Sequence, residues 1–270
     1  TLFAIGAGLT ALAGAILALT YMKDQQFIGW SHYITNGLFN SICAVTETLS
    51  SGVSVDAVYT VVQRTVGGVA VQYIERFVER SFPTGYTSAW CVDAGLRYSG
   101  SPATTFTGAE HLAGLSVTGL ADGVVIPPFT MPTTGIFTLS APASVVTIGL
   151  AYTCKLQTLP LDVGDPSVQG RTKKITHVDI RVVDTLGLEI GSSFGLTVPM
   201  KDLVLGNVSS ALTGQPNPQT VAGLITGDAA TYLDPTYTVP GQFCIQQRQP
   251  YPATVLGVFP RFAEGARNER

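Results

Sequence analysis

The sequence predicts an all-β protein, in which a propeller-blade-like antiparallel sheet is followed by small β-barrel or β-sandwich modules. Short runs rich in β-branched and aromatic residues, such as DAVYTVVQRTV and VAVQYIERF, alternate with turn residues and show little helical periodicity. Glycine (29) and proline (16) are frequent, and charged residues make up 12% of the chain, about half the usual fraction. Because so few charges are available to cover a surface, part of that surface is expected to lie against other subunits.

Residues 1–82 are predicted to form the blade-like sheet, as the end of a larger domain. Four or five consecutive strands would form a meander, with hairpin turns at Asp24-Gln25-Gln26 and at Gly67-Gly68. Trp30 falls in the middle of a strand, where a large ring can pack between stacked sheets. No second blade-length unit is visible, so further blades are expected before Thr1 or from a neighbouring subunit.

Proline, glycine and serine in FPTGYTSA predict a boundary after the first sheet. Residues 90–162 are then expected to form a small β-barrel or sandwich, with strands at FTGAEHL, LSVTGLADG, GIFTLS and VVTIGLAY. Residues 166–263 are expected to form a β-sandwich with a long loop at 200–241 and a final hairpin around Gln249-Pro250. The charged residues 264–270 are expected to be a frayed tail.

One strand of the third region shows a clear two-residue alternation. Apolar side chains fall mostly on one face, and polar ones on the other, as in a half-exposed antiparallel strand. The apolar set is Ile175, Val178, Ile180 and Val182, and the polar set is His177, Asp179 and Arg181.

The apolar run from Leu2 to Leu19 approaches the length of a membrane span or a signal-peptide core. No basic residue precedes it and the chain has no initiating Met, so we expect buried β-structure at a fragment boundary and no stable membrane insertion. The same run holds Gly6, Gly8 and Ala11 in the order of a dinucleotide-binding turn. No acidic residue follows at the required distance, so no cofactor is predicted.

No catalytic or metal site is predicted. The histidines His32, His111 and His177 are more than 60 residues apart and are expected to be structural or to lie at the surface, with Glu110-His111 in a loop. Asp179, Asp184 and Glu189 are interpreted as a solvated strand face and not as glycosidase carboxylates. The four cysteines have apolar neighbours and no metal-site spacing, so buried free thiols are favoured over a disulfide; they are Cys43, Cys91, Cys154 and Cys244.

The charge of the chain gives no basic field for nucleic-acid binding, since the net charge is −3 and the pI is about 5.5. Two weak basic groups are interpreted as ordinary surface charge, although the first could also line an assembly interface or contact DNA transiently. They are Arg171, Lys173 and Lys174, and Arg261, Arg267 and Arg270.

Several segments, in this order, resemble the end of the phage tail nozzle family, also called tail tubular protein B. They are LALTYMKDQQFIGWSHY, VQYIERF, DAGLRYSGSPATTFTGAEHLAGLSVTGLADG, VVTIGLAYTCKLQTLPL, KKITHVDIRVVDTLGLEIG and QRQPYPATVLGVFPRF. The resemblance covers roughly residues 15 to 262 and departs from the family in the glycine- and proline-rich stretch after Met200. In the family the middle module is often labelled as similar to a half-domain of ubiquitin-activating enzymes. Cys91 and Cys154 have no neighbouring base, so thioester chemistry is not expected.

The resemblance implies a non-enzymatic structural protein of the virion, assembled in the host cytoplasm. Such a protein forms a hexameric ring at the distal end of the tail, below the tail adaptor, through which DNA leaves and onto which fibres or a needle dock. Two other functions stay open. One is a receptor- or carbohydrate-binding module using Tyr232, Tyr237 and Tyr251 in proline-rich loops. The other is a polysaccharide hydrolase, which would need a carboxylate pair in a cleft.

Overall fold

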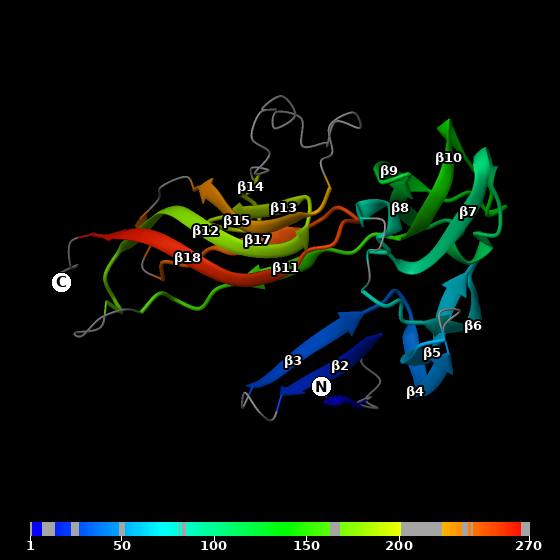
Figure 1. Ribbon diagram of the computed structural model, residues 1–270, viewed down its shortest axis with the longest axis horizontal. Helices are drawn as coiled ribbons and strands as arrows, with labels where there is room; N and C mark the ends of the chain where they lie inside the picture. Colours follow the sequence, from blue (N-terminus) through cyan, green and yellow to red (C-terminus); the bar gives the residue numbers. More distant parts are fainter. Residues whose placement is uncertain are drawn as a thin grey trace.

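The protein is almost entirely β-structure, as the sequence predicts (Figure 1). The computed structural model describes residues 2–6, 14–22, 27–48, 52–80, 82, 85–162, 168–200, 223–233, 237–238 and 240–265. Within these ranges the helical elements are two short 3-10 helices, η2 (Gly85–Ser88) and η3 (Glu110–Leu112). No helix in the described ranges is long and apolar enough to span a membrane.

The predicted single blade is instead two separate three-stranded antiparallel sheets. The first sheet contains β1 (Leu2–Gly6), β2 (Ala15–Met22) and β3 (Phe27–Ile34), and the second contains β4 (Leu38–Thr48), β5 (Ser54–Val66) and β6 (Val69–Arg76). The chain bends at Thr35–Gly37, where the Thr35 amide donates to the Gly14 carbonyl over 2.8 Å and ends the β2–β3 ladder. The new strand therefore starts a sheet of its own.

Local turn chemistry sets the hairpins. Gly67 and Gly68 have φ values of 57° and 84°, the left-handed pair of a two-residue β5–β6 turn, as predicted. Asp122 and Gly123 form a turn of the same kind, with φ values of 47° and 85°, between two strands of the middle sheet. The predicted turn at residues 24–26, and Gly8 and Ala11, lie outside the described residues.

The middle module is one curled four-stranded sheet of order β7-β10-β8-β9 over its own apolar core. Its strands are β7 (Asp93–Phe106), β8 (Ser116–Ala121), β9 (Val124–Thr130) and β10 (Phe137–Leu150). Register shifts between β7 and β10 mark bulges, which bend a long strand pair. The predicted strands GIFTLS and VVTIGLAY are accordingly one strand up to Leu150, and the predicted strand FTGAEHL is wrong because the chain turns into η3 after Phe106.

The carboxy-terminal module is a β-sandwich. One sheet has the order β11-β17-β13-β14 and the other β15-β12-β16, with β18 also pairing with β12. The strands are β11 (Cys154–Gln157), β12 (Lys173–Thr185), β13 (Leu188–Gly191), β14 (Thr197–Pro199), β15 (Ile225–Tyr232), β16 (Tyr237–Thr238), β17 (Cys244–Gln247) and β18 (Val255–Glu264). The core between the sheets includes Ile175, Val178, Ile180 and Val182, so the predicted alternation of β12 is confirmed.

Four details of the sandwich differ from the expectation. Strand β11 lies within residues 90–162 but pairs with β17, so the middle sheet ends at Leu150. Strands β15 and β16 lie within the expected 200–241 loop, of which 201–222 is outside the described residues. Strands β17 and β18 belong to opposite sheets and form no hairpin. Strand β18 extends to Glu264 of the expected tail, and the Gly265 amide donates to Thr172.

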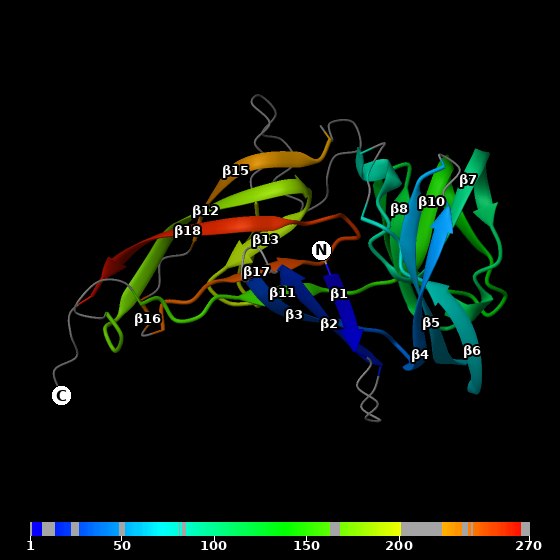
Figure 2. The same ribbon diagram turned by 60° about the horizontal axis from the view of Figure 1, so that its bottom comes forward.

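The middle sheet lies at one end of the sandwich (Figure 2), and a third apolar cluster joins the two. It contains Ala89, Leu120, Leu186 and Tyr251, which come from segments before β7, in β8, between β12 and β13, and after β17. The Tyr251 hydroxyl donates to the Gly123 carbonyl over 2.8 Å, across 128 residues of sequence. The junction between the two modules therefore combines this apolar cluster with a hydrogen bond from a buried tyrosine to a hairpin turn.

Candidate assembly and binding surfaces

The first sheet exposes an apolar face. In the β2–β3 register Ala15 lies opposite Ile34, Leu19 opposite Trp30 and Tyr21 opposite Ile28, and facing residues of an antiparallel pair point to the same side. Five large apolar side chains on this face are between 37% and 67% exposed: Leu17, Tyr21, Ile28, Trp30 and Ile34. Trp30 was expected to pack between sheets, and this prediction is wrong for the single chain.

The opposite face of the same hairpin is covered along β2 and exposed along β3, where Tyr33 is 51% exposed. Ile16 and Ala18 are buried there, and Tyr33, which pairs with Ile16, meets Phe77 edge-on with ring centroids 5.6 Å apart. Residues 14–22 and 27–34 contain no Asp, Glu, Lys or Arg. The apolar content of both faces was visible in the runs AILALTYM and FIGWSHYI. Antiparallel strands with one face in water normally alternate apolar and polar residues, and these two runs contain few polar residues.

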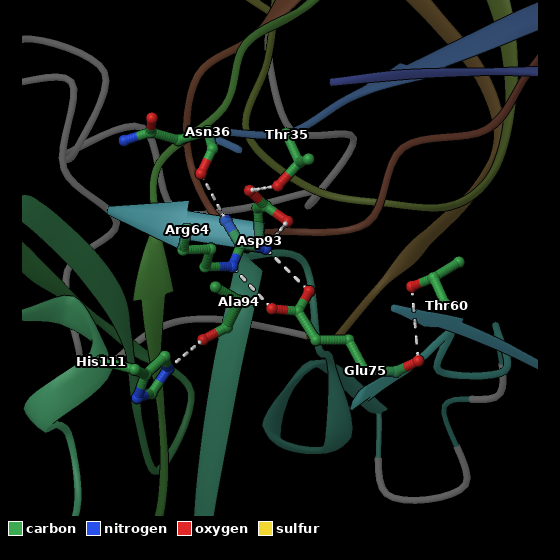
Figure 3. A network of polar contacts seen from close by, with 8 residues as sticks. All are labelled: Thr35, Asn36, Thr60, Arg64, Glu75, Asp93, Ala94 and His111. Atoms are coloured by element: carbon green, nitrogen blue, oxygen red, sulfur yellow. Dashed lines mark hydrogen bonds and ion pairs between the residues drawn. The ribbon is translucent and has the colours of Figure 1, made fainter. Parts of the chain in front are cut away.

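A buried ion network fixes the bend that leads from this sheet into the second one (Figure 3). The Arg64 side chain, 2% exposed, donates to both carboxylate oxygens of Glu75 over 2.6 and 2.7 Å and approaches Asp93 at 3.5 Å. It also donates to the Asn36 carbonyl over 2.8 Å, and the Thr35 hydroxyl donates to Asp93 over 2.6 Å. Desolvation opposes the charge on Arg64, but the carboxylates outweigh it and raise its pKa.

This network ties four segments of the chain together. Arg64 comes from β5, Glu75 from β6 and Asp93 from the start of β7, while the bend after β3 supplies a hydroxyl donor at position 35 and a carbonyl acceptor at position 36. The neighbouring His111 donates to the Ala94 carbonyl over 2.8 Å and packs near the Tyr73 ring. The orientation of the open apolar face is thus set by buried charge at its base.

A second surface is the outer face of the sandwich sheet β15-β12-β18. Across its three strands the outward residues form three rows, Tyr232-His177-Arg261, Ala230-Asp179-Phe259 and Asp228-Arg181-Gly257. His177 donates to Asp179 over 2.6 Å, and Arg181 and Asp228 form a two-bond ion pair of 2.7 and 2.9 Å. Tyr232 and Phe259 are 69% and 48% exposed.

Hydrogen bonds shift the acidic groups of this face. The His177 hydrogen bond, assisted by Arg261, lowers the pKa of Asp179 below its ordinary value of 3.8, and Arg181 does the same for Asp228. On the second sheet, the Tyr59 hydroxyl and Arg76 lower the pKa of Glu47. Groups whose pKa is lower in the folded state stabilise it above their unfolded pKa, and this contribution disappears as the pH falls through the folded pKa.

We therefore expect acid to weaken the fold through these pairs. The free energy of unfolding should fall as the pH is lowered from about 5 to about 2, because the unfolded chain then binds more protons. Denaturant titrations across this range should show a shallower fall for Asp228→Asn than for the wild type. Equal slopes for the two proteins would contradict the assignment of the pKa shift to Arg181.

Of the three tyrosines expected in binding loops, only Tyr232 lies on an exposed described surface. Tyr251 is buried in the junction between modules, where burial raises its pKa. Tyr237 lies in β16, and its side chain is outside the described part of the structure. The partner ring Phe259, contributed by the motif VFPRF, was missed because pairing between β12 and β18 cannot be read from local sequence.

The remaining candidate residues are not brought together. His32 is exposed on the first sheet, while His111 and His177 make separate contacts. Asp184 lies in a left-handed backbone conformation at the end of β12, and Glu189 accepts from Thr197 and Gln246. Within the described ranges no group of three His, Cys, Asp or Glu side chains could hold a metal.

All four cysteines are free thiols, as favoured, but only Cys244 is buried. Cys43 on β4 and Cys154 on β11 are exposed. Cys91 is partly buried, and burial raises its pKa to about 11. A thiol with so high a pKa is a poor nucleophile at neutral pH.

Among the basic residues that the structure describes, Lys173 differs from the expectation, whereas Arg171 and Arg261 lie at the surface as expected. Lys173 was interpreted as surface charge but is buried, with its alkyl chain beneath Gly241. Arg171 pairs with Glu264 over 2.8 Å, and Arg261 lies 3.3 Å from Asp179. Arg267 and Arg270 are outside the described residues.

A scan against models of protein families found no match, and a search of curated protein sequences found none either. The resemblance to phage tail nozzle proteins therefore stays a prediction from the sequence motifs.

Proposed function

We propose that this chain is a structural subunit that assembles with copies of itself through the open face of the sheet β1-β2-β3. The observation that carries the proposal is the row of exposed apolar side chains on that face. Large exposed apolar patches are rare on soluble monomers and are typical of protein interfaces. An aromatic residue at the centre, here Trp30, is a frequent energetic anchor of such interfaces.

A second copy is the favoured partner for two reasons. The face carries no charged residue in its described strands, so it offers nothing to a charged ligand such as DNA. Among the described residues β3 pairs with β2 alone, so its outer edge is available for strand pairing continuous with the apolar face. Self-association through the apolar face and the open edge of β3 would also cover part of the surface of a chain in which charged residues make up only 12%.

The particular assembly we propose is the nozzle ring at the distal end of a phage tail, in the virion. The ordered motifs that resemble the nozzle family support this choice, and the all-β modular fold is compatible with it. In a ring each face meets a different patch of its neighbour, because only head-to-tail contacts close a cyclic oligomer larger than a dimer. The adaptor above the ring, fibres or a needle below it, and DNA passing through it are the partners this proposal includes.

Replacing Trp30 with aspartate should dissociate the oligomer into single chains. A charge placed in the middle of a buried apolar contact costs several kcal/mol of association free energy. Size-exclusion chromatography with light scattering should show the wild type at a multiple of 28.4 kDa and Trp30→Asp at the mass of one chain. Leu196→Asp is the matched control, since Leu196 is equally exposed but lies on the sandwich.

The proposal fails if the wild type is a monomer at high concentration, or if Trp30→Asp assembles as the wild type does. A reconstruction of the native particle tests the finer statement. Copies of the chain in a symmetric ring at the distal tail would support the nozzle, whereas copies in a spike or fibre away from the tail axis would exclude it and leave only the assembly surface.

A further inference from the structure

We infer that the outer face of the sheet β15-β12-β18 is a binding platform for a neutral oligosaccharide. The platform is defined by Tyr232, Phe259, Asp179, Arg181 and Arg261, with His177 and Asp228 as supporting residues. It is independent of the assembly surface, which lies on a different sheet.

The two exposed rings are held in place by neighbours. The Tyr232 ring meets the His177 ring edge-on, with centroids 4.7 Å apart. The Phe259 ring lies over Gly257, where a Cβ atom would come within 3.2 Å of it, and the Arg181 guanidinium lies 5.6 Å from its centroid. Rings fixed in this way lose little side-chain entropy on binding, which distinguishes them from isolated exposed aromatics.

The polar groups between the rings are also fixed. Asp179 stands in the central strand and accepts from His177 through one oxygen and from Arg261 through the other. Arg181 is locked to Asp228 by two bonds, as described above. A sugar with neighbouring hydroxyls can donate to the outer lone pairs of Asp179 and accept from the remaining N–H groups of Arg261, with the geometry already set.

The charge balance selects the class of ligand. Two arginines face two aspartates, so the rows carry no net positive field, and a polyanion such as DNA gains little from binding there. A partner protein would favour a larger apolar patch with fewer charges at its centre. A neutral sugar matches both features, because it presents apolar C–H faces to rings and hydroxyls that donate and accept.

The shape of the face sets the size of the ligand. Tyr232 and Phe259 lie on β15 and β18, two strand spacings apart across the sheet and two residues apart along it, so their backbones are separated by roughly 12 Å. Ala230 and Gly257 lie beside the rings, and because their side chains are small or absent they leave room for a ligand to lie flat against the sheet. The ligand is therefore an oligosaccharide long enough to touch both rings.

The test uses the full chain and four neutral hexasaccharides, of glucose, galactose, mannose and N-acetylglucosamine. Saturation-transfer NMR detects binding and titration calorimetry measures it. We expect at least one to bind, and Tyr232→Ala and Phe259→Ala each to weaken binding about tenfold, the loss of one stacking contact. Tyr232→Phe should stay within about threefold of the wild type, and Asp179→Asn should weaken binding while leaving the fold intact.

Leu196→Ala is the matched control, since Leu196 is as exposed as Tyr232 but lies just before β14 on the other sheet of the sandwich, and this variant should bind as the wild type does. Thermal unfolding of each variant checks that the exposed substitutions leave the fold unchanged. The inference is overturned if none of the four sugars binds, if binding survives in Tyr232→Ala/Phe259→Ala, or if a DNA oligonucleotide displaces the bound sugar. Failure of these tests would leave the oligomer measurements unaffected, so the two proposals can be judged separately.

Discussion

Replacing Tyr251 with alanine should lower the free energy of unfolding by about 3–5 kcal/mol, the usual cost of removing a large buried ring. Tyr251 is buried between the middle sheet and the sandwich, and its ring meets that of Tyr86 edge-on. The substitution also leaves the Gly123 carbonyl without the hydroxyl that bonds to it. Because the ring is shared by two modules, we expect the wild type to unfold in one transition and the variant in two, which calorimetry and denaturant titration would detect.

Two variants separate the contributions at this site. Tyr251→Phe keeps the ring and removes the hydrogen bond, so it should cost about 1 kcal/mol. Tyr232→Ala removes an exposed tyrosine from the same module and should change stability by less than about 0.5 kcal/mol. A Tyr251→Ala protein as stable as the wild type would show that the junction is not a shared core.

Replacing Arg64 with methionine should cost about 3 kcal/mol. The cation is buried, and its removal leaves Glu75 and Asp93 facing each other without a positive partner. Both carboxylates are about a quarter exposed and keep some hydration, which places the effect at the lower end of the range for broken buried pairs. Chemical denaturation at neutral pH gives the value directly.

Arg76→Met is the control for this prediction, because Arg76 pairs with Glu47 on the same sheet but at the surface. Surface pairs are worth less than about 1 kcal/mol, so this variant should stay close to the wild type. Arg64→Met/Glu75→Leu should recover part of the loss, since removing both partners leaves fewer unpaired charges. If Arg64→Met and Arg76→Met had equal effects, the network at the bend would have no special role in stability.

The strands were predicted well because their signals are local. Alternation identified β12, and β-branched runs with turn residues identified the strands from β2 to β6. Pairing between distant strands could not be predicted in this way. The bend at Thr35 depends on contacts with Gly14 and with Arg64, and the separation of β17 from β18 depends on sheets formed by residues as far away as β11.

The same limit applies to the surfaces. The sequence marked Trp30 as a large ring in a strand, but whether that ring is covered depends on which sheets stack, and the break between β3 and β4 leaves it open. Tyr232 was identified as a candidate, whereas Phe259 and Arg261 join it only through the β12–β18 pairing across more than 80 residues. Both Tyr251 and Tyr232 lie near proline in the sequence, but the ring of Tyr251 is buried between two modules whereas that of Tyr232 is exposed.

The order in which the sheets are completed bears on how the protein folds during synthesis. The β2–β3 hairpin closes from neighbouring residues, and such local pairings form early and fast. The sandwich needs β17 and β18, so it cannot close until the ribosome has released residues up to Glu264. The nascent chain therefore exposes the apolar face of its first sheet while its last module is still incomplete. On polysomes, where several nascent chains lie close together, this exposed face favours premature association between neighbouring chains.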